Sequence, residues 1–170
     1  MTDPLVEDNV AMLAQAVRLV APMPATLFDA KSPASLGASI GGHLRHVIDH
    51  YRCFLRGAET GAIDYDARER SPAIESDPEV AVAALREVSD ELGQLAVEVL
   101  DAAARVRMDT GGAEERPWTR SSVRRELQFL LSHTVHHFAL IAMICRARGH
   151  AVEPEFGVAP STLRYRRQAG

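Results

Sequence analysis

The sequence predicts an all-α protein, an up-down four-helix bundle, on three observations. Four long segments carry apolar residues at spacings of three and four, which is the repeat of one helix face. No segment shows a convincing alternation of apolar and polar residues, the pattern of a half-buried strand. Two of the segments open with an Asp-Pro pair, a favoured start for a helix. Four helices joined by loops are expected to pack as a bundle.

The first predicted helix begins after Asp3 and ends before Pro22, where a loop rich in Pro, Ala, Ser and Gly follows. The second runs from about Ser39 to Glu59, with Gly61 as its terminator. The apolar faces of these two helices consist of Val6, Val10, Leu13, Val17 and Val20, and of Ile40, Leu44, Val47, Tyr51, Phe54 and Leu55.

The third predicted helix opens at Asp77 and runs to about Ala104. The fourth is capped by Ser121 or Ser122 and continues to Arg148, whose charge suits the negative end of the helix dipole. The polar connection between the second and third helices is longer than a minimal bundle requires, and long loops are often functional.

Composition restricts the class of protein. A chain of 170 residues and 18.6 kDa suits one domain with a core that needs no disulfides, so we expect Cys53 and Cys145 to be buried free thiols. The net charge of −4 gives no reason to expect nucleic-acid binding. Uninterrupted apolar runs fall short of a bilayer span, and the acidic start MTDPLVEDNV lacks signal-peptide features. We therefore expect a cytoplasmic protein with no membrane partner.

The seven histidines are concentrated on two helices. His43, His46 and His50 fall within about 60° of one another on the second helix, hence on one face. His133 and His137 lie one turn and about 40° apart on the fourth helix, so both imidazoles can reach a single point. Such a pair and a third imidazole from a facing helix form a three-nitrogen metal site with an open coordination position. The alternative is that these histidines only pack in the bundle or face solvent.

The segments SIGGHLRHVIDHYRCFL and RELQFLLSHTVHHFALIAMI resemble the two signature helices of the DinB/YfiT-like superfamily. The resemblance extends from about Pro4 to Arg148 and implies a DinB-like four-helix bundle over residues 1–150, with 151–170 as a C-terminal extension of the same domain. It also implies a divalent metal. The implied ligands are His46, from the G-x-x-L-x-H frame, and the pair His133 and His137, with His50 as the alternative ligand from the second helix.

The resemblance implies a metal-dependent enzyme, because the superfamily includes thiol-dependent S-transferases and hydrolase-like members. A metal-activated thiol or water would attack a small-molecule substrate, and no protein nucleophile is expected. Zinc or nickel is expected, and iron also suits imidazole ligands. The alternatives are a non-catalytic metal-binding or stress-associated bundle, and a helical interaction module whose histidines are incidental.

Polar residues near the histidines have open assignments. Asp49 could accept a hydrogen bond from a ligating imidazole or be a solvated charge. Glu126 shares the face of His133 but lies two turns away, too far for an obvious ligand. Four residues of the 62–76 loop could form a substrate rim or simply be solvated: Asp64, Tyr65, Asp66 and Arg68.

The first and fourth helices are apolar over more than one bundle seam, which predicts a homodimer packed through them. The surplus on the fourth helix is Leu127, Leu130, Leu131, Phe138, Leu140, Ile141, Met143 and Ile144. The alternative cover is the chain's own C-terminal segment, in which Phe156, Val158 and Leu163 could fold back over that helix.

Overall fold

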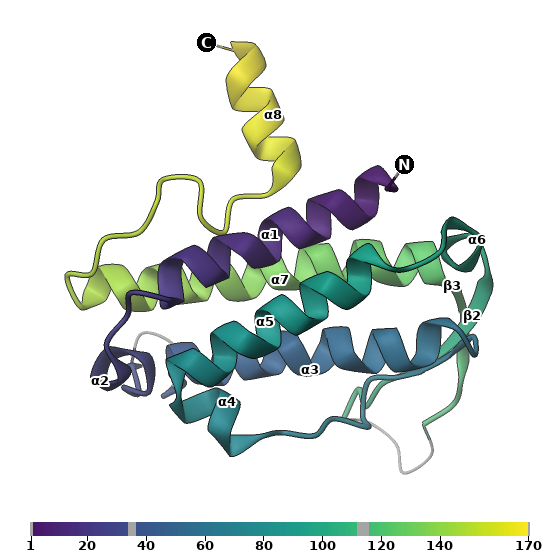
Figure 1. The fold of residues 1–170 in the computed structure, drawn as a ribbon, viewed down its shortest axis with the longest axis horizontal. Coiled ribbons are helices and arrows are strands. Elements are labelled where there is room, and N and C mark those ends of the chain that lie inside the picture. The colour runs from purple at the N-terminus through teal and green to yellow at the C-terminus, as the bar shows by residue number, and fades with distance from the viewer. Residues whose placement is uncertain (1, 34–36, 112–115, 170) are drawn as a thin grey trace.

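The computed structural model describes residues 2–33, 37–111 and 116–169. Four long helices form a bundle, in which α1 packs against α5 and α7, and α3 also packs against α5 and α7 (Figure 1). Their bounds are α1, Pro4–Val20; α3, Ile40–Ala58; α5, Pro78–Gly93; and α7, Val123–Ala147. The predicted all-α bundle is confirmed.

Each long helix begins where a side chain satisfies a free backbone N–H. Asp3 accepts a hydrogen bond from Leu5 N, and Ser39 accepts one from Gly42 N. Asp77 caps α5 in the same way. Of the two serines proposed for the fourth long helix, Ser122 is the cap.

A small sheet lies at one end of the bundle, although no strand was expected. It is ordered β1-β2-β3, with β1 (Ala62–Asp64) parallel to β2 (Ala103–Arg107) and β2 antiparallel to β3 (Thr119–Ser122). The expectation of no strands is wrong because these strands are three to five residues long. Over so few residues, alternation does not stand out from the sequence.

The third predicted helix is also shorter than expected. Helix α5 ends at Gly93, and the chain then forms a short helix, α6 (Val97–Leu100), before entering β2 at Ala103. The predicted end near Ala104 is wrong. Leu92 and Leu100 are both buried, so the sequence keeps the apolar spacing of one helix on both sides of the break between α5 and α6, and this spacing hides the break. A glycine inside a helical pattern weakens the helix, and here it coincides with the end.

Two glycines let the connection after α3 lie directly against that helix. A Cβ on Gly41 would lie 1.9 Å from the backbone oxygen of Glu75 in α4 (Pro72–Ser76), and one on Gly57 would lie 2.7 Å from the Cα of Ile63 in β1. Neither position has room for a side chain. The connection between β1 and α4 is therefore held beside the helix that carries the first histidine group.

A buried hydrogen-bond chain ties three long helices together. The Tyr51 hydroxyl donates to Oδ1 of Asn9 at 2.7 Å, and Thr134 Oγ1 donates to the Tyr51 hydroxyl at 3.2 Å. These residues come from α3, α1 and α7 and are buried in the core. Satisfied buried polar groups favour one packing arrangement over alternatives that would leave them unpaired.

The C-terminal segment covers part of α7. Phe156 is buried and stacks on Phe138 with ring centroids 4.9 Å apart. The helix that follows, α8 (Pro160–Ala169), has no buried residue and projects from the bundle (Figure 1). The surplus apolar residues that the chain buries itself are Leu127, Leu130, Phe138, Ile141 and Ile144. Intramolecular packing therefore accounts for much of the surplus, and the homodimer remains a prediction.

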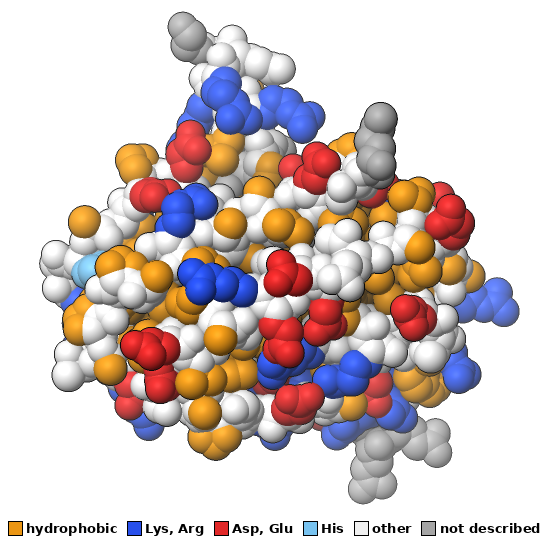
Figure 2. Space-filling view, viewed as in Figure 1, with side chains coloured by type: hydrophobic (Ala, Val, Ile, Leu, Met, Phe, Trp, Pro, Cys, Tyr) orange, Lys and Arg blue, Asp and Glu red, His pale blue; other side chains and the backbone are white. Residues whose placement is uncertain are grey.

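One helix, α7, is long and apolar enough to cross a membrane by length and composition alone, with a mean hydropathy of 1.4 over its most apolar window. Counting only uninterrupted apolar runs missed this property. The core helix of a bundle meets the same criterion, and α7 buries Leu130, Phe138 and Ile141 inside the bundle. The face of the bundle that α1 and α5 form carries interspersed acidic, basic and apolar side chains (Figure 2).

Replacing Phe156 with Ala should destabilise the protein by about 3 kcal/mol, because the change removes a buried ring that stacks on Phe138. Urea denaturation measures the free energy of unfolding. Tyr165→Ala is the matched control, since that ring is 71% exposed and its loss should change stability by less than about 0.5 kcal/mol. Equal effects of the two substitutions would show that the segment does not pack on α7.

Candidate metal centre

Helices α3 and α7 pack against each other, and their facing sides carry the histidines. From α3, His43 and His50 are buried and His46 is half-buried; from α7, His133 and His137 are half-buried. The helical repeat places the members of each group on one face. The packing of the two helices then brings the two groups together.

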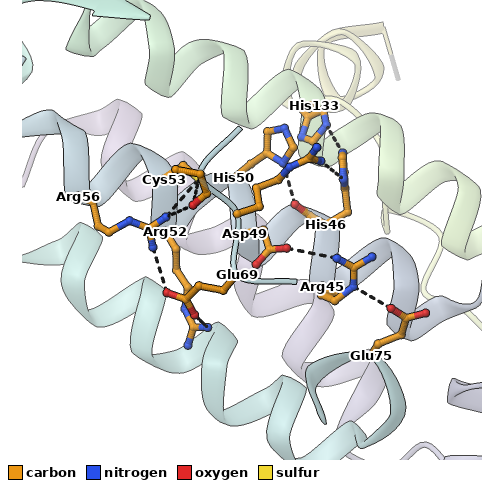
Figure 3. Close-up of polar contacts among 12 residues, drawn as sticks. Arg45, His46, Asp49, His50, Arg52, Cys53, Arg56, Glu69, Glu75 and His133 are labelled. Atoms are coloured by element: carbon orange, nitrogen blue, oxygen red, sulfur yellow. Dashed lines mark hydrogen bonds and ion pairs between the residues drawn. The ribbon is translucent and has the colours of Figure 1, made fainter. Parts of the chain in front are cut away.

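The ring nitrogens converge on a small volume. His46 Nε2 lies 3.1 Å from His133 Nε2, and His137 Nε2 lies 3.2 Å from the same atom. One ligand nitrogen from each of His46, His50 and His133 also falls within 4.8 Å of the others. Figure 3 shows these three side chains gathered between the two helices. All four imidazoles proposed from the sequence therefore lie together.

These separations fit a shared divalent cation. Imidazole nitrogens bind zinc at about 2.0–2.1 Å, so two ligand nitrogens at ordinary coordination angles lie about 3.0–3.4 Å apart. The nitrogens of His46 and His137 lie at such distances from that of His133. A neutral imidazole nitrogen carries either one proton or one lone pair, so His133 Nε2 cannot make a full hydrogen bond with each. A cation accepts all the lone pairs at once.

His50 has its ring proton fixed by the fold. Its Nδ1 lies 2.8 Å from the backbone oxygen of His46, which can only accept, so Nδ1 donates and Nε2 keeps its lone pair. This is the tautomer that a ligand bound through Nε2 requires. The structure thus places His50 as well as His46 within the cluster, and the choice of three ligands among the four imidazoles remains a prediction.

Burial keeps the cluster uncharged. Desolvation, followed by repulsion from neighbouring histidines, lowers the pKa of His46 to about 2, of His133 to about 3 and of His137 to about 4. Burial also lowers the pKa of His43 and His50. Metal ligands must be neutral imidazoles, so the fold holds these side chains in the form that binds a cation.

His43 lies behind the cluster, with its Nδ1 3.0 Å from Nδ1 of His137. That contact can orient the His137 ring, as groups behind metal ligands commonly do. His136 is exposed, and its ring lies steeply tilted to that of His137, with the ring centroids 5.2 Å apart.

The acidic residues near the cluster have other partners. Asp49 is buried, not solvated, and pairs with Arg45, which in turn pairs with Glu75 (Figure 3). Glu126 accepts hydrogen bonds from Tyr65 at 3.1 Å and from Ser121 at 2.5 Å. The ring of Tyr65 also stacks on the ring of His50, so the hydrogen bond from Tyr65 to Glu126 helps to hold a ring that packs against the cluster.

The four loop residues proposed as a substrate rim do not act together. Asp64 pairs with Arg107, and Asp66 pairs with Arg116. Tyr65 is buried beneath His50. Only Arg68, among these four, contacts a histidine side chain as a polar partner, with its Nη1 3.3 Å from His46 Nδ1. The rim hypothesis therefore reduces to one residue.

The fold and the site define the class of protein, a four-helix bundle with a cluster of imidazoles between two of its helices. The family model of the DinB superfamily matches residues 10–141, and the chain belongs to this superfamily. The resemblance proposed from the two histidine helices is thereby confirmed.

Two individual proteins are similar to this chain over different extents. A DinB-like protein (YjoA) from Bacillus subtilis has a similar solved fold, with a TM-score of 0.65 at 19% identity, covering 89% of this chain and 96% of that one. A protein described as FK506-binding protein 5, from Rhizopus delemar, is 29% identical over 104 residues, or 61% of this chain. The match spans 27% of the length of that relative.

The depressed pKa values predict that the metal-free protein loses stability in weak acid. Below about pH 6.5 the unfolded chain gains protons on His46, His133 and His137 that the folded chain does not take up. The free energy of unfolding should therefore fall from pH 6.5 toward pH 5, by up to about 1.4 kcal/mol per pH unit for each histidine. Urea denaturation in the presence of a chelator measures it.

The same experiment on His133→Ala should give a shallower slope, because one of the histidines is gone. A wild-type stability that stays constant between pH 7 and pH 5 would contradict the burial of uncharged imidazoles in this cluster.

Proposed function

We propose that the protein is a divalent-metal-dependent enzyme with thiol-dependent S-transferase-like chemistry. The observation that supports the proposal best is the convergence of His46, His133 and His137 nitrogens, at 3.1 and 3.2 Å, from two different helices. Membership of the DinB superfamily is consistent with it. His50 is the alternative ligand from α3.

A divalent ion held by three neutral imidazoles keeps its full charge and strongly acidifies a bound thiol or water. In the proposed transfer, the thiol gives its proton to water and its sulfur forms a bond to an electrophilic carbon, while the bond from that carbon to its leaving group breaks and the leaving group departs with the electron pair, as chloride would from monochlorobimane. The protein residues hold and orient: the histidines supply uncharged ligands, and His43 positions the ring of His137. His46, His133 and His137 are each half-buried, so part of each residue stays exposed.

The second candidate function is a non-catalytic metal-binding or stress-associated bundle. One respect in which the structure supports it is that Asp49 pairs with Arg45 and Glu126 accepts hydrogen bonds from Tyr65 and Ser121. Both candidates require the metal, for which we propose zinc or nickel, with iron also compatible with imidazole ligands.

Purified protein should bind one divalent ion per chain, and His133→Ala should abolish binding, because the His133 nitrogen is the one that meets both His46 and His137. Zinc titration by calorimetry measures the stoichiometry. His136→Ala is the matched control on the same helix, since its ring is exposed, and it should retain one ion per chain. Equal zinc binding by His133→Ala and wild type would contradict the proposed site.

Metal-loaded protein should accelerate conjugation of a low-molecular-weight thiol to an electrophile such as monochlorobimane, measured by fluorescence. The acceleration should disappear in His133→Ala and persist in His136→Ala. One bound ion per chain without acceleration, across several thiols and electrophiles, would favour the non-catalytic bundle.

We further propose a cytoplasmic homodimer packed through α1 and α7. Light scattering should report twice the mass of 18.6 kDa, and a chain truncated after His150 should still dimerise if the helices form the interface. A monomer at high micromolar concentration would contradict the dimer.

A further inference from the structure

We propose that Arg68 is an anion-binding residue of the histidine site, so that the ligand carries a carboxylate or phosphate group in addition to the group that reaches the metal. The inference rests on the proposed function, because it gives the chemical class of the small molecule for that same site. The substrate class it defines is an anionic thiol, not a neutral one.

The position of Arg68 is the first argument. It is half-buried beside the cluster, with Nη1 3.3 Å from His46 Nδ1. Its Nε is buried and has no hydrogen-bond partner among the described residues. A guanidinium carries five donors in a planar fork that matches two oxygens of one anion. At least one buried donor of this fork is therefore left without an acceptor among the described residues.

The charge of Arg68 is the second argument. The adjoining helix α3 contains three arginines, and each pairs with a carboxylate: Arg45, Arg52 and Arg56. Arg68 forms no ion pair within the described parts of the chain. The nearby acids Asp49, Asp66 and Glu69 are all paired with other arginines. A cationic group therefore faces the histidines without a carboxylate partner.

The state of His46 is the third argument. An arginine can only donate, so the contact with Arg68 requires a lone pair on His46 Nδ1 and a proton on Nε2. When Nε2 instead provides its lone pair to a metal, Nδ1 carries the proton and no longer accepts from Arg68. Metal binding through His46 would thus free a second donor of the guanidinium. It would also add positive charge nearby, so an anion is the group that both cations attract.

Two thiols that differ in charge test the proposal. The probes are 3-mercaptopropionate, which carries a carboxylate, and 2-mercaptoethanol, which is neutral, each titrated into zinc-loaded protein by calorimetry. Wild type should bind 3-mercaptopropionate at least about tenfold more tightly, as a charge-assisted hydrogen bond to a partly buried guanidinium allows. In Arg68→Gln the two affinities should agree within about twofold. Because both thiols are titrated into the same variant, a general loss of folded protein would affect both titrations alike and leave the ratio of the two affinities unchanged.

Arg70→Gln is the matched control, because it removes the same charge from an exposed position two residues away and should keep the wild-type preference. Arg68→Lys should keep part of the preference, since it retains the charge but loses the fork. A wild type without preference, or a preference that survives in Arg68→Gln, would overturn the proposal.

Zinc titration of the same proteins separates this inference from the proposed function. Arg68→Gln should bind zinc at least as tightly as wild type, because the change removes a positive charge beside the ligands. If wild type binds no zinc, the proposed function fails, and propionate titrated into the zinc-free proteins decides the role of Arg68 alone. Propionate binding that is lost in Arg68→Gln and kept in Arg70→Gln would support the anion site. Equal heats of propionate binding in wild type, Arg68→Gln and Arg70→Gln would overturn it.

Discussion

The packing of α3 against α7 is the contact on which the site depends, because it buries several uncharged imidazoles with their nitrogens about one hydrogen-bond length apart. Burying polar atoms without full partners costs free energy. The chain offsets that cost with apolar packing along the same helices and with the Thr134–Tyr51 hydrogen bond, which joins them. A divalent cation that accepts the lone pairs of these neighbouring ring nitrogens would stabilise the arrangement.

The charged groups around the cluster also affect which ligand it can receive. Carboxylates close to the histidines are neutralised by arginines, as Asp49 is by Arg45, or bound by hydroxyl groups, as Glu126 is by Tyr65 and Ser121. Asp49 Oδ2 and both carboxylate oxygens of Glu126 are therefore engaged by other groups. The site combines neutral nitrogen ligands with the cationic Arg68, which suits a metal centre that receives an anionic ligand from solution.

Local patterns in the sequence predicted much of this structure. The caps Asp3, Ser39 and Asp77 act through hydrogen bonds within two or three residues, so the chain order alone reveals them. His133 and His137 are one turn apart on one helix, and their convergence follows from the helical repeat. The sequence also predicts that His46 and His50 share one face of α3. It does not show which ring nitrogen of His50 carries the proton, because that depends on the contact of His50 Nδ1 with the His46 backbone oxygen.

Contacts between distant segments could not be predicted. The strands β1, β2 and β3 are stabilised by pairing between separate segments, as Ala62 pairs with Arg105 and Ala103 with Ser122, and each strand is too short to show a pattern. Tyr65 reaches Glu126 across 61 positions, and Arg68 reaches His46 only because glycines at 41 and 57 allow the connection to lie on α3. In the sequence, Arg68 was one of several charged loop residues, and no local signal separates it from its neighbours.

The central claim is that the imidazoles between α3 and α7 bind a divalent metal. Anomalous diffraction from crystals of zinc-loaded protein, recorded on both sides of the zinc edge, tests it most directly. We expect one strong peak per chain at about 2.0–2.2 Å from His133 Nε2 and from nitrogens of two further histidines among His46, His50 and His137. A peak bound by other residues, or no peak between these helices, would contradict it.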